Sequence, residues 1–433
     1  MEPTTVGLIG LVLLIIVLFS RMPVGFAMAL VGVLGFSYVV SWNAGLRMLA
    51  KDFYSIFGSY SLTVVPLFIL MGQVTFHAGI SRRLFDTAYR FIGHLPGGLA
   101  IATVASCAGF AAICGSTNAA AATMATVALP EMKRYKYDMV LGTGTVAAGG
   151  SLGILIPPSV IFIVYGILTE QSIGKLFVAG VLPGILLSLL FVAAIFIWVT
   201  INPAIAPRGP KATLREKIVS LKGVIETLVL FALVMGGLFL GFFTPTEAGA
   251  IGAGGAIILG MVTGRLVWKG LIQALVESTR ISCMVMVIVA GATMFGHFLA
   301  ITRIPYALAT WVSELPLPHW AIMAFIMFLY LVGGCFIDAL ALILLTIPIF
   351  FPVVMDMGYD PIWFGVIIVL VTQMGVITPP VGVNVYVVSG VVRDVPLETI
   401  FKGALPFLFA LIFLALLLIP FPQIALFLPG LMR

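Results

Sequence analysis

The sequence predicts an all-α polytopic membrane protein that is built from two inverted repeats. The chain is 62% hydrophobic and only 9% charged, whereas soluble domains carry about 25% charged residues. Apolar runs of about 20 residues recur along it, each long enough to cross about 30 Å of hydrocarbon. The two halves also repeat each other, with basic loops on opposite sides. The lipid bilayer is therefore the expected solvent, and the net charge of +6 does not indicate a nucleic-acid partner.

The first apolar segment, TTVGLIGLVLLIIVLFS (4–20), is expected to be a retained transmembrane helix. Acidic Glu2 precedes it, and no small-residue cleavage site follows, unlike in a signal peptide. The cysteines all lie in apolar segments and are expected to be small core residues rather than metal ligands or disulfide partners. They are Cys107, Cys114, Cys283 and Cys335.

An internal repeat with a spacing of about 220 residues organises the chain. LPEMKRYKYD (129–138) aligns with FPVVMDMGYD (351–360), and GILIPPS (153–159) aligns with GVITPPV (375–381). A polar stretch separates the two copies. We therefore expect a first repeat over 1–201, a linker over 202–222 and a second repeat over 223–433.

The charges of equivalent loops indicate that the repeats are inverted. RRLFDTAYR (82–90) and KRYK (133–136) are basic, but their counterparts SELPLPHW (313–320) and MDMGYD (355–360) contain no Lys or Arg. Lys and Arg mark the cytoplasmic side, so equivalent loops lie on opposite faces. This places both termini outside and the linker in the cytoplasm, with Arg303 as the one exception.

Each repeat is expected to contain a re-entrant helical hairpin. The first runs over about 96–133, and the polar stretch CGSTN (114–118) forms its tip between two helix-compatible arms. Its counterpart runs over about 318–355 and enters from the opposite side, with GGCFID (333–338) at the tip.

An interrupted helix follows each hairpin, over about 139–168 and 360–392. Pro157-Pro158 and Pro379-Pro380 break these helices, because proline lacks a donor and clashes with the preceding turn. Irregular backbone at membrane depth is tolerated where it lines a cavity or is buried, and its carbonyl groups can then bind cations. Gly, Ser and Pro can also serve only close packing or kinks. Finding both features twice, in inverted copies, favours a functional site.

Four stretches carry a resemblance that covers essentially the whole chain: CGSTNAAAATMATVALPEM, LGILIPPSVIFIVYG, FTPTEAGAIGA and GVITPPVGVNVYVVSG. With them the sequence resembles the large membrane subunit (M, DctM-like) of tripartite ATP-independent periplasmic (TRAP) transporters. The resemblance implies an inverted-repeat, elevator-type fold in the bacterial inner membrane. It also implies sodium-driven uptake, a periplasmic substrate-binding protein (P) and a small membrane subunit (Q). Because the chain starts with the first M-like helix, we expect Q to be a separate polypeptide.

The resulting hypothesis is Na⁺-coupled uptake of an organic anion, with a cation site between hairpin tip and helix break in each half. Carbonyl and hydroxyl oxygens suit this hard ion. Asp338 aligns with Ser116 and is the leading cation ligand, since an ionisable residue at membrane depth is a functional candidate. The candidates for the first site are Gly115, Ser116, Thr117, Asn118, Gly149, Gly150 and Gly153, and those for the second are Gly334, Cys335, Asp338, Gly375 and Thr378.

The substrate is expected between the two tips, and C4-dicarboxylates, sialic acid and related sugar acids all stay open. No Lys or Arg lies at membrane depth to hold a carboxylate, and the resemblance assigns selective recognition to the binding protein. Hairpins and broken helices would move as one transport domain against a scaffold of the remaining helices. His297 is expected to have a packing role. The candidate substrate contacts are Ser116, Asn118, Thr378, Pro379, Asn384 and Tyr386.

The alternative functions are a single-component symporter, an intramembrane enzyme and a channel. A single-component divalent-anion/sodium symporter of similar architecture would work without a binding protein, and residue chemistry alone does not separate it from the tripartite type. An intramembrane enzyme would need a nucleophile–base or metal-ligand set, and HExxH and GxSxG patterns are missing. A channel fits two hairpins with helix breaks less well than an occluding carrier does. No enzymatic activity is expected.

Overall fold

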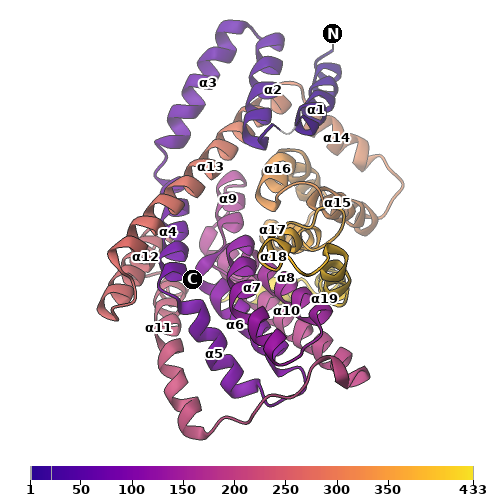
Figure 1. Cartoon of the computed structure of the whole chain (residues 1–433). Coiled ribbons are helices and arrows are strands. Elements are labelled where there is room, and N and C mark those ends of the chain that lie inside the picture. Colours follow the sequence, from indigo (N-terminus) through magenta and orange to yellow (C-terminus); the bar gives the residue numbers. More distant parts are fainter. Residues whose placement is uncertain (1, 21, 433) are drawn as a thin grey trace.

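The computed structural model describes residues 2–20 and 22–432, and their regular structure is entirely helical (Figure 1). Five of the described helices are long and apolar enough to cross a membrane, and the number rises to seven if two bent helix pairs each count as one span. The five are α10 (Ile173–Ile201), α12 (Pro245–Val262), α13 (Trp268–Ile301), α16 (Ala339–Asp356) and α19 (Leu397–Leu418). The bent pairs are α3 (Trp42–Phe57) with α4 (Val64–His77), and the two parts of α11 (Leu214–Phe239).

One group of helices, called the α13 layer here, combines the start of each half. It comprises α1 (Pro3–Phe19), α2 (Val24–Val39), α3, α4, α11, α12 and α13. Figure 1 shows α13 running beside α2, α3 and α4, and α12 packs along α4. Small residues permit this close approach. A Cβ on Gly32 would lie 2.7 Å from the backbone of Met294, and one on Gly25 would lie 2.9 Å from that of Ile288.

The second group, called the hairpin layer here, contains the hairpins, the broken helices and the helices that flank them in the chain. The first hairpin is α6 (Gly98–Cys114) with α7 (Thr117–Arg134), and the second is α15 (His319–Gly334) with α16. The first broken helix is α8 (Met139–Ser151), the turn η2 (Leu152–Ile154) and α9 (Val160–Leu168), and the second is α17 (Pro361–Gly375) with α18 (Val383–Val391). The remaining helices are α5 (Ile80–Ile92), α10, α14 (Ile304–Ser313), α19 and α20 (Gln423–Gly430).

Some boundaries differ from the sequence expectation for local reasons. The first tip is shorter than CGSTN, because the Ser116 side chain caps α7 by accepting a hydrogen bond from the backbone N–H of Ala119. The expected linker is helical from Leu214 onward, where Thr213 and Glu216 form a reciprocal capping box. Both Pro-Pro peptide bonds at the helix breaks are cis.

The packing of the hairpin layer is reciprocal between the two halves. α8 packs on α19 as α17 packs on α10, and α7 packs on α18 as α16 packs on α9. At the centre, Gln373 Nε2 donates to Ser151 Oγ at 2.8 Å, and these residues align in the repeat. Two copies related by a two-fold axis make contacts of this kind.

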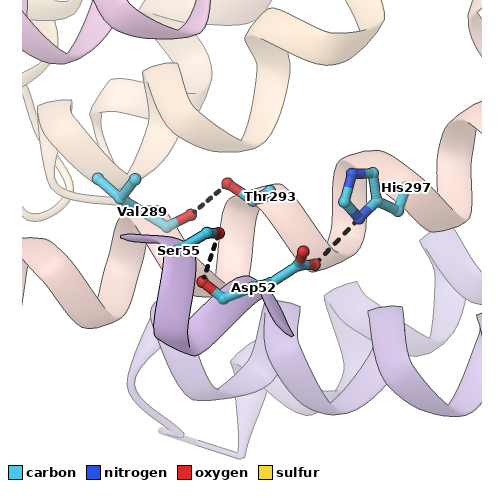
Figure 2. A network of polar contacts seen from close by, with 5 residues as sticks. All are labelled: Asp52, Ser55, Val289, Thr293 and His297. Atoms are coloured by element: carbon cyan, nitrogen blue, oxygen red, sulfur yellow. Dashed lines mark hydrogen bonds and ion pairs between the residues drawn. The ribbon is translucent and has the colours of Figure 1, made fainter. Parts of the chain in front are cut away.

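Two histidine–carboxylate contacts join the halves at opposite ends of α13. Near its C-terminal end, His297 Nδ1 lies 3.0 Å from the buried carboxylate of Asp52 on α3 (Figure 2). Toward its N-terminal end, Glu277 lies 3.2 Å from His77 Nε2 on α4. His297 therefore has a polar partner beyond the expected packing role.

Candidate functional site

The tips of both hairpins line one cavity of about 260 Å³ between the two layers. The hairpin layer contributes residues 114–119, residues around the first helix break, and 338–340. The α13 layer contributes α4 and α13, including Gln73 and Met284. Among the described residues that line the cavity, Asp338 is the only Asp, Glu, Lys or Arg. The cavity is thus a junction of both repeats and both layers.

The first tip turns because of Gly115, whose φ of +62° lies in the left-handed region that favours glycine. A Cβ at Gly115 would lie 2.6 Å from the carbonyl oxygen of Pro158 at the first break. A Cβ at Gly153 would likewise lie 2.7 Å from the carbonyl oxygen of Ser116. The two glycines therefore let the tip and the break meet through their backbones.

Ser159 adds a hydroxyl beside this contact that sequence reasoning missed. It is fully buried, and its Oγ has no hydrogen-bond partner among the described residues. The only signal was its position directly after Pro157-Pro158. The carbonyl groups of Ser116 and Pro158 and this hydroxyl are hard oxygen ligands, the kind that suits Na⁺.

Other residues of the first candidate site lie elsewhere around the tip. Thr117 and Asn118 line the cavity, and their side-chain oxygens are 3.4 Å apart. Gly149 faces the side chain of Cys107 on α6, and Gly150 faces Ala121 on α7. The structure thus packs these two glycines against the hairpin arms rather than at its tip.

The second tip also meets its broken helix through glycines. A Cβ on Gly375 would overlap the backbone of Gly334, so only glycine allows this approach. Thr378 Oγ1 donates to the carbonyl of Met374 at 2.7 Å. The buried thiol of Cys335 points back to the carbonyl of Leu331 at 3.2 Å.

Asp338 lies at the second tip as the N-cap of α16, where it accepts a hydrogen bond of 3.1 Å from the backbone N–H of Leu340. It lines the cavity together with Ser116 and Asn118 of the first tip. Gly375 and Thr378 are not among the described residues that line it. The cavity therefore brings Asp338 together with the first tip, and the pairing of Asp338 with Gly375 and Thr378 stays a prediction.

Only two of the six candidate substrate contacts are among the described residues that line this cavity. Ser116 and Asn118 line the cavity, whereas Thr378, Pro379, Asn384 and Tyr386 are not among its described lining residues. Asn384 is fully buried and donates to the carbonyl of Ala147 at 3.0 Å, and Tyr386 is 51% exposed. Gln73 and Met284 were missed, because neither α4 nor α13 carries a break or polar tip that would mark them.

A family model described as "Tripartite ATP-independent periplasmic transporter, DctM component" matches residues 11–424. The chain belongs to this family of TRAP permeases. It is therefore a transporter permease of the membrane and not an enzyme, as the sequence motifs predict. Membership favours the tripartite type over the single-component symporter.

Similar TRAP permeases are named for different substrates. The C4-dicarboxylate TRAP transporter large permease protein DctM of Pseudomonas aeruginosa is 38% identical, covering 89% of this chain and 90% of the relative. The sialic acid TRAP transporter large permease protein SiaM of Vibrio cholerae is 36% identical, covering 96% of each chain. The isethionate TRAP transporter permease protein DctMQ of Oleidesulfovibrio alaskensis is 35% identical, covering 90% of this chain and 62% of the relative.

Solved transporter structures share the fold. The YdaH transporter of Alcanivorax borkumensis matches with a TM-score of 0.60 and 16% identity, covering 88% of this chain and 90% of that one. MtrF of Neisseria gonorrhoeae matches with a TM-score of 0.54 and 15% identity, covering 86% and 83%. These matches and the helices described above confirm the predicted all-α polytopic membrane fold.

Proposed function

We propose that this TRAP permease carries out sodium-coupled uptake of a small organic anion, which a periplasmic substrate-binding protein delivers. The observation that carries the proposal is the single cavity between the two hairpin tips. Three helices begin at its wall, α7 at Thr117, α9 at Val160 and α16 at Ala339. Helix N-termini carry partial positive charge and favour anions, so the cavity can hold an anion without a basic side chain.

The carboxylate of Asp338 supports coupling to a cation. A bare carboxylate in the cavity would repel an anionic substrate, and a bound Na⁺ would remove this repulsion. The oxygens of Ser116, Pro158 and Ser159 lie at the same tip and offer ligands of the kind Na⁺ accepts. Binding of the cation would then favour binding of the anion, which is the thermodynamic basis of symport.

The substrate class follows from chemistry shared by the relatives. These relatives are named for C4-dicarboxylates, sialic acid, isethionate and ectoine. Each of these molecules carries a carboxylate or a sulfonate. We assign to this chain a small organic acid of the C4-dicarboxylate, sialic acid or sugar-acid type.

The transport step is assigned to an elevator motion in the bacterial inner membrane. The hairpins and broken helices, over about 96–168 and 318–392, move as the transport domain, and the other helices form the scaffold. The basic loops favour an orientation with both termini in the periplasm and the linker in the cytoplasm. A small Q subunit is the membrane partner in this proposal.

Reconstitution tests this function. The chain with its Q subunit is placed in proteoliposomes, and uptake of a labelled C4-dicarboxylate or sialic acid is measured with an inward Na⁺ gradient. Uptake should require both the gradient and the binding protein. Uptake without the binding protein would establish the single-component alternative. Uptake that is the same in Na⁺ and K⁺ would show that Na⁺ is not the coupling ion.

A further inference from the structure

A second set of polar groups lies where the two broken helices cross, outside the described lining of the cavity. Gln373 on α17 and Asn384 on α18 are both fully buried. Their side-chain amides contact consecutive turns of α8. Gln373 Nε2 donates to Ser151 Oγ at 2.8 Å, and Asn384 Nδ2 donates to the carbonyl of Ala147 at 3.0 Å.

The hydrogen bonds determine which end of each amide faces α8. The Ser151 hydroxyl donates its proton to the carbonyl of Ala148 at 2.6 Å, so its oxygen accepts from Gln373. The carbonyl of Ala147 can only accept. Both residues must therefore present their NH₂ groups to α8 and direct their carbonyl oxygens elsewhere.

Neither amide oxygen is satisfied. Gln373 Oε1 and Asn384 Oδ1 are buried and have no hydrogen-bond partner among the described residues. Burying an acceptor without a donor costs free energy, and such groups in a native protein require an explanation. The backbones of the two segments also meet, since Asn384 N–H donates to the carbonyl of Val376, less than one turn beyond Gln373.

The chemistry of the two oxygens selects the ligand. Amide oxygens attract a cation and repel an anion, and oxygen ligands do not select the softer transition metals. Ca²⁺ and Mg²⁺ are usually held by carboxylates, whereas both ligands here are neutral. A monovalent hard cation is the species that fits.

We propose that Gln373 Oε1 and Asn384 Oδ1 bind a sodium ion at the crossing of the two broken helices. This inference rests on the proposed function, because it adds a site to the same sodium-coupled machinery. The ligands come from the second repeat, and their amide nitrogens are anchored on α8 of the first. The ion would thus stabilise the crossing of the two helices. Its binding should therefore raise the unfolding temperature of the protein, which can be measured without a transport assay.

The test is thermal unfolding of the full chain in detergent, titrated with NaCl against KCl at constant ionic strength. Gln373→Met and Asn384→Leu each remove the oxygen and keep the size of the side chain. We expect each to lower the apparent Na⁺ affinity at least tenfold and to unfold near the wild-type temperature in KCl. Gln373→Glu keeps an oxygen and should retain the Na⁺ response. Gln273→Met is the matched control, since Gln273 is exposed on α13.

The possible results separate this site from the proposed function. A full Na⁺ response in both Gln373→Met and Asn384→Leu would overturn the site while leaving sodium coupling intact. An equal loss of stability in NaCl and KCl would assign the amides a purely structural role and also overturn the site. A wild-type protein that responds equally to Na⁺ and K⁺ would contradict both the site and the coupling ion.

Discussion

Ser116 and Asp338 occupy the same position in the two halves, because each caps the second arm of its hairpin. Both residues line the same cavity, yet only Asp338 has an acidic side chain. The caps explain why polar residues occur at two otherwise apolar tips. The two halves are therefore chemically unequal at equivalent positions of one cavity.

Asp338→Asn should weaken sodium coupling. The amide keeps the size and capping capacity of the side chain but removes the negative charge. The Na⁺ concentration for half-maximal uptake should rise about tenfold or more, which corresponds to about 1.4 kcal/mol of binding free energy. Ser116→Ala should have a smaller effect in the same direction. Asp356→Asn, at the exposed end of α16, is the control, and an equal effect of both Asp changes would argue against a cavity-specific role.

Gly153→Ala should disrupt the contact between the first tip and the first break. The added Cβ would lie 2.7 Å from the carbonyl oxygen of Ser116, which belongs to backbone and cannot rotate away. Overpacking of this kind costs about 1–3 kcal/mol, so the melting temperature and uptake should both fall. Gly254→Ala in α12 meets nothing within 4 Å and should be neutral or slightly stabilising. If both changes had the same effect, the close approach would not be the cause.

At the scale of elements, local chemistry made the hairpins and breaks predictable. Glycine, proline and capping residues act within a few positions, so the tips and the Pro-Pro breaks could be located from sequence. Contacts between distant segments have no comparable local sequence signal. Ser159, Gln73 and the partner of His297 were missed because their surroundings are assembled from helices far apart in the chain.

The two histidine–carboxylate contacts of α13 should differ in strength. Asp52 is buried, with 6% of its side chain exposed, whereas 49% of Glu277 is exposed. Exposed pairs contribute little because water screens them. A double-mutant cycle on Asp52 and His297 should give a coupling free energy of about 1 kcal/mol, and one on His77 and Glu277 less than about 0.5 kcal/mol. Chemical unfolding in detergent measures both, and the reverse order would contradict this account of the layer.

The capping box that begins α12 should stabilise that helix. The Thr244 side chain accepts from the N–H of Glu247, and the Glu247 carboxylate accepts from the N–H of Thr244. Thr244→Ala should cost about 1 kcal/mol, seen as a lower melting temperature with unchanged Na⁺ affinity, since α12 lies outside the described cavity. Thr244→Ser keeps the hydroxyl and should behave like wild type. A change in Na⁺ affinity would place α12 in the coupling machinery instead.

For the whole molecule, the cavity lies between the proposed transport domain and the proposed scaffold, as an elevator mechanism requires. Gln73 on α4 belongs to the proposed scaffold, and Ala119 on α7 belongs to the proposed transport domain, yet both line the cavity. Moving the transport domain past the scaffold would change their separation. Ala119 and Val160 on α9 would instead move together, because both belong to the transport domain.

Cross-linking tests whether the proposed transport domain moves against the scaffold. In a chain whose native cysteines are replaced, Gln73→Cys with Ala119→Cys should allow a cleavable bifunctional thiol reagent to join the two parts. Uptake by that protein should then fall to about a tenth or less and recover when the link is reduced, because such a link would block the proposed elevator motion. Ala119→Cys with Val160→Cys is the matched control, and its link should leave uptake near the value before treatment. Equal inhibition by both links would favour a local gate at the tip over an elevator, since only motion of the transport domain relative to the scaffold distinguishes the two pairs.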